Sequence, residues 1–313
     1  MISYLFLHYN RPYFLELNIK LLRKYIKDTP FEIIVADDGS DKEVINRIKK
    51  EMCPDKLFVQ KNNFNTTGKG SCSNTILGGR ALCKGDYLVF AEDDFLFFPS
   101  EITDMTFHKN EELMPRCYYN KDLDSSDIFS SSINILNSNR DIKNVQLARD
   151  SKRVPTKDPF LSKDGKKWEF VNHKEKGGAY YCNWVNMSRM EDAKRIVIPK
   201  DRSIWSLESY LSCEWDRIFG KGDWSVCPER RYFLHIGTAF SKRKDSFSKS
   251  AKRIVSSQKL QANAFNEIKT KTLEGFCDLI LESWKTRKFY IDFEELINSG
   301  LNESFTSAFD RIK

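Results

Sequence analysis

The sequence contains no apolar run that approaches the ~20 residues a membrane-spanning helix needs. The first residues, Met1 to His8, lack a basic region and a small-residue cleavage site, so they are typical of a first strand and not of a signal peptide. The eight cysteines include no C-x-x-C pair. We therefore expect no zinc site, reduced thiols and a cytoplasmic location.

The 313 residues suffice for one large domain, or for one domain with an appended subdomain. The formal net charge of +7 is unevenly distributed. Residues 241–271 hold nine Lys or Arg and two acidic residues, and nine minus two equals the whole excess of +7. We expect this segment to face an anionic partner such as nucleic acid, anionic lipid headgroups or a phosphorylated glycan.

Strand-like and helix-like patterns alternate over the first hundred residues. Strands are predicted at 2–9, 31–36, 57–60 and 87–91. Helices are predicted after the first three strands, at 12–26, 41–50 and 71–83. This alternation predicts an α/β fold, a Rossmann-like doubly wound and mostly parallel sheet. Residues 100–180 are less regular, and we expect a few strands with long loops there.

Acidic residues follow two of these predicted strands, as Asp37-Asp38 and as Glu92-Asp93-Asp94. Because ligands of parallel sheets bind at the carboxyl ends of strands, the loops at 8–11, 37–41 and 92–94 are expected to converge on one crevice. Three carboxylates beside an apolar strand need a positive partner, and a hard divalent cation would supply it while leaving room for phosphates. A solvated acidic turn at 92–94 and an Asx turn after Asp37 are the alternatives without a ligand.

Four segments resemble, in order and spacing, the nucleotide-sugar-binding half of family 2-like glycosyltransferases with the GT-A fold. They are His8-Tyr9-Asn10-Arg11-Pro12, Ile33 to Asp41, Asn65 to Gly70 with Asn74, and Gly85 to Asp94. This resemblance covers residues 2–99, and weaker similarity follows at Cys213 to Arg217 and at Phe233 to Gly237. It implies a glycosyltransferase domain at 1–240, divided into a nucleotide-sugar-binding half (1–99) and an acceptor half (100–240). Residues 241–313 would form a basic, helical C-terminal extension.

The same resemblance implies an enzyme that transfers a sugar from a nucleotide sugar, with a UDP-sugar as the leading donor, to a hydroxyl group with inversion. The implied cofactor is Mn²⁺ or Mg²⁺, and a histidine ligand would favour Mn²⁺. The expected acceptor is anionic, as a phosphorylated glycan or a lipid-linked saccharide, and a peripheral membrane contact would accompany the latter.

Individual residues receive roles from the resemblance. Asp37 or Asp38 is expected to bind the base or the ribose through its carboxylate. Asp94 and His235 are the expected metal ligands. An acceptor hydroxyl must lose a proton, so Asp216 or Glu214 is the expected base, with Asp216 preferred. The remaining expected donor-binding residues are Tyr9, Arg11, Lys69, Glu92 and Asp93.

Three alternatives remain open from the sequence. Transfer to hydroxyl-modified bases in DNA would use the basic segment 241–271, with Phe247 and Phe265 among its charges. A nucleotidyltransferase would be expected to carry a glycine-rich basic loop after the first strand, and Tyr9-Asn10-Arg11-Pro12 is not one. A binding module without catalysis would not need the intact acidic triplet at 92–94.

Overall fold

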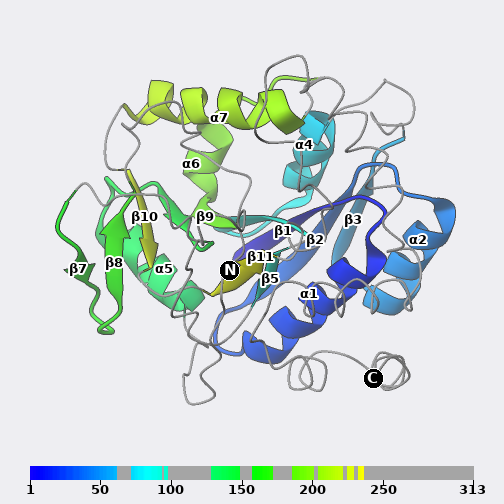
Figure 1. Cartoon of the computed structure of the whole chain (residues 1–313), viewed down its shortest axis with the longest axis horizontal. Helices are drawn as coiled ribbons and strands as arrows, with labels where there is room; N and C mark the ends of the chain where they lie inside the picture. The colour runs from blue at the N-terminus through cyan, green and yellow to red at the C-terminus, as the bar shows by residue number, and fades with distance from the viewer. Residues whose placement is uncertain are drawn as a thin grey trace, which may run out of the picture.

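The protein is described by a computed structural model over residues 1–61, 72–93, 95–97, 128–148, 157–171, 185–200, 204–220, 224–228 and 232–235. Within these residues the chain forms one large mixed sheet with helices on both of its faces (Figure 1). The segments 98–127 and 236–313, including the predicted C-terminal extension and its basic stretch, lie outside the described residues.

The sheet has nine strands in the order β3-β2-β1-β4-β9-β6-β10-β8-β7. Its strands are β1 (Ile2–His8), β2 (Phe31–Asp37), β3 (Lys56–Val59), β4 (Tyr87–Glu92), β6 (Asn144–Gln146), β7 (Phe160–Leu161), β8 (Lys167–Phe170), β9 (Asn186–Arg189) and β10 (Ser225–Pro228). The half that holds β3, β2, β1 and β4 is entirely parallel, whereas β9 and β8 run against their neighbours. The predicted α/β class with a mostly parallel sheet is therefore confirmed.

Helices cover both faces of the sheet, which makes it doubly wound (Figure 1). One face carries α1 (Pro12–Tyr25), α2 (Lys42–Arg47), the π-helix η1 (Ile48–Met52) and α5 (Ile128–Ser138). The other carries α4 (Cys72–Leu82), α6 (Met190–Arg195) and α7 (Ile204–Phe219). Alternate residues of β1 enter the two cores, Tyr4 and Phe6 on one side and Leu5 and Leu7 on the other. This two-sided burial explains why the first strand has no polar alternation.

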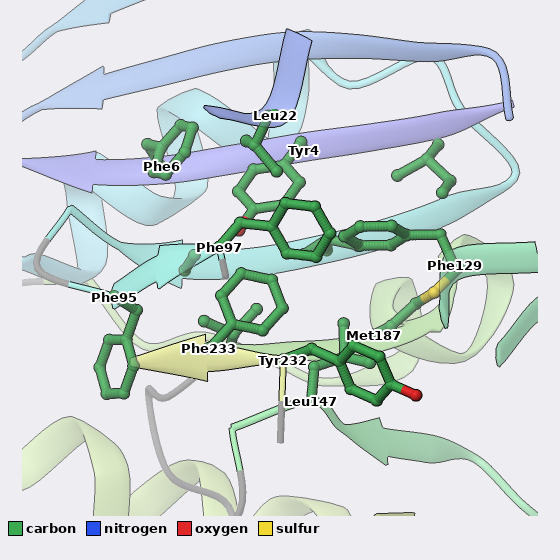
Figure 2. Close-up of a cluster of buried hydrophobic side chains, with 14 of the residues drawn as sticks. Tyr4, Phe6, Leu22, Phe95, Phe97, Phe129, Leu147, Met187, Tyr232 and Phe233 are labelled. Carbon is green, nitrogen blue, oxygen red and sulfur yellow. The ribbon is translucent and has the colours of Figure 1, made fainter. Parts of the chain in front are cut away.

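A second, two-stranded sheet pairs β5 (Phe95–Phe97) antiparallel with β11 (Phe233–His235). Its aromatic side chains belong to the core under β1 and α5 (Figure 2). The ring centroid of Phe97 lies 5.3 Å from that of Phe233 and 5.6 Å from that of Phe129. This packing holds the chain firmly where it leaves β4, so the acidic turn between β4 and β5 has a fixed strand on each side.

The predicted helices and strands of the first hundred residues are present, with ends within a few residues of those expected. The main difference is α5, which lies where strands and loops were predicted. Its apolar positions Ile128, Phe129, Ile135 and Leu136 are spaced at two helical turns and are all buried. The serines between them obscure this pattern in the sequence, although Ser132 Oγ simply donates to the Ile128 carbonyl at 2.7 Å. Among the described residues, no helix is long and apolar enough to cross a membrane.

Candidate functional site

The pairing of the central strands brings three loops to one edge of the sheet. His8, the last residue of β1, lies opposite Asp37, the last residue of β2. On the other side of β1, Leu7 lies opposite Glu92, the last residue of β4. The loops that begin after His8, Asp37 and Glu92 therefore start side by side at the carboxyl edge, as the sequence predicted.

Asp37 is fully buried and organises the loop that follows β2. Its Oδ1 accepts hydrogen bonds from the backbone N–H groups of Gly39 (2.9 Å) and Ser40 (2.7 Å). Its Oδ2 accepts from the Ser40 hydroxyl (2.5 Å) and lies 2.8 Å from His8 Nδ1. Gly39 has φ +84°, a conformation that favours glycine. The Asx turn raised as the alternative for this segment is thus present, and Asp37 is fully engaged in it.

Asp93 and Arg11 form a buried ion pair at the same edge. The Asp93 side chain has 0% exposure and that of Arg11 has 14%. The backbone N–H of Asp93 donates to the Leu7 carbonyl at 3.2 Å, and its carbonyl accepts from Asn18 Nδ2 at 2.6 Å. Arg11 and Asp93 were both expected to bind the donor, but the structure turns these two side chains toward each other.

Asn10 fastens the first loop to the second. The backbone N–H of Asn10 donates to Ser40 Oγ at 2.8 Å, and Asn10 Oδ1 accepts from the Asp41 backbone N–H at 3.0 Å. Asn10 has φ +50°, which asparagine tolerates better than most residues. The loops after β1 and β2 consequently form one hydrogen-bonded unit.

Asp38 lies at the rim of this unit and is only partly buried. Its Oδ1 accepts a hydrogen bond of 2.6 Å from the Thr75 hydroxyl of α4. Burial raises the pKa of Asp38 from 3.8 to about 6, the Thr75 hydrogen bond opposes that rise, and the neighbouring Asp37 adds to it. Tyr9 and Glu92 are half-buried at the same edge. Of the two aspartates expected to bind base or ribose, Asp38 is the one with exposed surface.

The expected metal ligands are described only in part. Asp94 and Lys69 lie outside the described residues, and so does the side chain of His235. The backbone of His235 pairs opposite Phe95 in the small sheet, so it lies across from the residue after Asp94. Within the part of the chain that the structure describes, no group of three His, Cys, Asp or Glu side chains could hold a metal ion.

The expected catalytic acids lie at a different place. Asp216, on α7, accepts a hydrogen bond of 3.3 Å from the indole Nε1 of Trp224. Trp224 immediately precedes β10. The first residue of β10, Ser225, aligns through β6 and β9 with Leu88, near the start of β4. Since β4 is six residues long, this level is about 20 Å along the strand from the acidic turn.

Glu214 lies two residues before Asp216 on α7, a rise of about 3 Å. Its two carboxylate oxygens accept hydrogen bonds of 2.9 Å from Arg217 Nε and Nη2. These contacts lower the pKa of Glu214, which makes it a weaker base. The structure does not bring Asp216 or Glu214 together with His8, Asp37 and Asp93, and their role as the base stays a prediction from the resemblance.

The sequence patterns assign no site role to His8, Thr75 or Asn18. In the structure His8 lies against both buried aspartates, Asp37 and Asp93. The Thr75 hydroxyl donates a hydrogen bond to Asp38, and the Asn18 amide donates one to the backbone carbonyl of Asp93. The signal available for His8 was its place at the carboxyl end of a strand in a parallel sheet. Thr75 and Asn18 lie inside helices, where no local pattern marks them.

Comparison with known families bears on the same edge of the sheet. Residues 5–123 match the model of glycosyl transferase family 2. This stretch is a family 2 glycosyltransferase domain. The match includes the second half of β1, all of β2 to β5 and all three loops described above, and it covers less than half of the 313-residue chain. The family predicted from residues 2–99 is thus confirmed for this part of the chain. No curated protein sequence matches the chain.

Several solved structures are similar to this chain. A crystal structure of an S. aureus TarS fragment has a TM-score of 0.47 at 12% identity, and the match covers 74% of this chain but only 59% of that one. The same fragment in complex with UDP-GlcNAc has a TM-score of 0.46 at 13% identity, with 98% and 81% covered. Glucosyl-3-phosphoglycerate synthase from Mycobacterium tuberculosis, in complex with Mn²⁺, UDP and glucosyl-3-phosphoglycerate, has a TM-score of 0.45 at 12% identity, with 84% and 78% covered. The family assignment rests on the sequence match.

Proposed function

We propose that this protein transfers a sugar from a nucleotide-sugar donor, a UDP-sugar, to a hydroxyl group with the help of a divalent metal ion. The observation that carries this proposal is the convergence of the loops after β1, β2 and β4 at one sheet edge, inside the stretch that matches glycosyl transferase family 2. Acidic residues lie at that edge on the two loops that flank the loop after β1, where a nucleotide and a metal-bound diphosphate need them.

Asp38 is the proposed contact to the nucleotide. It has exposed surface, whereas Asp37 is fully buried and saturated with hydrogen bonds. An ionised carboxylate accepts hydrogen bonds from a uracil N–H or from ribose hydroxyls, so Asp38 suits either group. Tyr9 and Glu92 at the rim are proposed to line the donor, and Lys69 to meet its diphosphate.

Asp94 and His235 are the proposed metal ligands. Arg11 already provides the counter-charge for Asp93, so the metal would be held by the acid that follows Asp93 in the chain. The backbone of His235 pairs with that of Phe95, the residue after Asp94, so an imidazole ligand would join the Asp94 carboxylate. A bound Mn²⁺ or Mg²⁺ would offset the negative charge that develops on the leaving diphosphate.

The acceptor is proposed to be an anionic glycan or a lipid-linked saccharide, and the transfer is proposed to invert the anomeric carbon. The base that receives the acceptor proton is not assigned to Asp216 or Glu214, because of their position. The DNA alternative has no support from the family match or from any described residue, since the basic segment 241–271 lies outside them.

The first experiment is a thermal-shift screen of nucleotide sugars with and without Mn²⁺. Ligands that bind the native state raise its melting temperature, by an amount that grows with concentration over Kd. We expect a UDP-sugar to raise it only when Mn²⁺ is present, and Asp94→Asn to abolish that shift. If no nucleotide or nucleotide sugar stabilises the protein, the proposed function is wrong. The anomeric configuration of the product, read by NMR, then tests inversion.

A further inference from the structure

Four residues connect the three loops at the carboxyl edge: Asp37 contacts His8, His8 contacts the backbone N–H of Arg11, and the side chain of Arg11 contacts Asp93. His8 Nδ1 lies 2.8 Å from Asp37 Oδ2, and its Nε2 lies 3.8 Å from Asp93 Oδ2. Arg11 forms an ion pair with Asp93. The side chains of His8, Asp37 and Asp93 have 0% exposure. Side chains without exposed surface do not contact a bound donor unless the loops rearrange, so an effect of these residues on a donor would be indirect.

The hydrogen bonds of His8 define how it joins the loops. Its Nε2 accepts from the backbone N–H of Arg11 at 3.3 Å. A backbone N–H can only donate, so Nε2 carries no proton and the ring proton is on Nδ1. Nδ1–H then donates to Asp37 Oδ2, the atom that also accepts from the Ser40 hydroxyl. His8 thus connects the loop of Arg11 to the loop of Asp37 and Ser40.

The charges in this link are balanced by different means. Asp37 is stabilised by four hydrogen-bond donors, including two backbone N–H groups. Asp93 forms a buried ion pair with the guanidinium of Arg11. Removing one member of a buried ion pair leaves a charge without compensation, which is strongly destabilising. The turn after β4 therefore depends on Arg11 for its stability.

We propose that His8 and Arg11 are positioning residues for the donor site. Together with Asp37 and Asp93, they hold the loop after β2 and the turn after β4 in one fixed arrangement. Their effect on the donor passes through Asp38, the residue that follows the buried Asp37. This inference rests on the proposed function for its second test below, but not for its first.

The first test is a double-mutant cycle on the full chain without any ligand, with thermal unfolding as the measurement. The variants are Arg11→Met, Asp93→Asn and the double variant. We expect Arg11→Met to lower the melting temperature most, and Asp93→Asn to restore part of that loss when combined with it, because it removes the unpaired charge. Losses that simply add in the double variant would overturn the ion-pair role of Arg11.

The second test measures the affinity for UDP in the presence of Mn²⁺ by titration calorimetry. His8→Phe keeps a ring but removes both nitrogens, whereas in His8→Asn the side-chain amide can replace Nδ1–H as donor to Asp37. Changes in groups that orient ligand-binding residues typically cost about 10- to 100-fold in affinity. We expect a loss of that size for His8→Phe and recovery of most of it in His8→Asn.

Leu5→Val, in the core of the same strand, is the control for lost packing stability, and it should leave the UDP affinity unchanged. Wild-type affinity in His8→Phe, equal losses in His8→Phe and His8→Asn, or a matching loss in Leu5→Val would each overturn the positioning role of His8. If the wild-type protein itself binds no UDP, the proposed function fails, and the ligand-free cycle still decides whether Arg11 and Asp93 are coupled.

Discussion

Adjacent aspartates at the end of β2 have opposite environments. Asp37 is fully buried beneath the loop with its carboxylate saturated by donors, and Asp38 lies at the rim against Thr75. Adjacent residues of an extended segment point in opposite directions, which accounts for the difference. Identical residue types thus separate into one that shapes the loop and one that is available to a ligand.

Asp38→Asn should weaken UDP binding and raise the melting temperature of the ligand-free protein at pH 7.5. The pKa of Asp38 in the folded protein is raised from 3.8 to about 6, so the folded state binds its proton more tightly than the unfolded state. Its contribution to stability is therefore present below pH 4 and is lost as the pH rises through 6. Asparagine stays neutral and can still accept the Thr75 hydrogen bond.

The measurements for Asp38 are melting curves and UDP titrations between pH 5 and 8. In the wild type, UDP affinity should fall as the pH drops below 6, because a protonated Asp38 accepts fewer hydrogen bonds. Asp41→Asn, an exposed change in the same loop, is the matched control and should change neither quantity. If Asp38→Asn has the melting temperature and the UDP affinity of the wild type, both the stability prediction and the binding prediction are wrong.

Asp216→Asn should retain sugar transfer at close to the wild-type rate. Its carboxylate is bound to the Trp224 indole at the edge of the sheet where β4 begins, about 20 Å along the strand from the acidic turn. A catalytic base must come within hydrogen-bond reach of the proton it accepts. Single-turnover rates at saturating donor test this, and a loss of ~100-fold or more would restore Asp216 as the base.

At the scale of elements, the small sheet of β5 and β11 connects core packing to the acidic turn. Phe97 is fully buried beside the rings of Phe129 and Phe233 (Figure 2). The ring of Tyr25 packs edge-on against it as well. The same small sheet aligns Phe95 with His235, which is distant in sequence. Aromatic packing therefore positions β5, the strand that follows β4 in the chain.

Phe97→Ala should lower the free energy of unfolding by about 3–5 kcal/mol, since it removes a large buried ring and leaves a cavity. Urea unfolding followed by fluorescence measures the loss. Phe97→Leu, which preserves most of the apolar volume, is the matched variant and should cost about half as much or less. If Phe97→Ala is as stable as the wild type, β5 does not contribute to the core in the way described.

At the scale of the whole molecule, the chain combines a stretch that matches glycosyl transferase family 2 with a strongly basic segment at 241–271. We expect the combined change Lys242→Ser, Arg243→Ser and Lys244→Ser to raise the KM for an anionic acceptor and to reduce its dependence on salt. Exposed charges attract an anionic partner, and salt screens that attraction over about 8–10 Å. The KM of the donor should not change.

Acceptor KM values between 50 and 300 mM salt would test the basic segment. As a control, Lys49→Ser, Lys50→Ser and Lys27→Ser remove the same charge from exposed positions elsewhere in the chain. If the two triple variants behave alike, net charge alone matters, and the segment has no specific part in acceptor recognition.

The sequence by itself determined the α/β class, the order of the first four strands along the chain and the edge at which their loops meet. Those features follow from local periodicity and from the positions of Pro12, Gly39 and the acidic ends of the strands, which act over a few residues. The family match over residues 5–123 agrees with that part of the chain.

Only the tertiary structure decided which acids share the site. Burial of Asp37 and Asp93, the pairing of Arg11 with Asp93 and the link through His8 depend on strand register between segments up to 85 residues apart, from His8 to Asp93. Asp216 contacts Trp224, which strand pairing places at the other edge of the sheet. The local sequence pattern does not specify the register between strands, because register depends on which distant strands become neighbours.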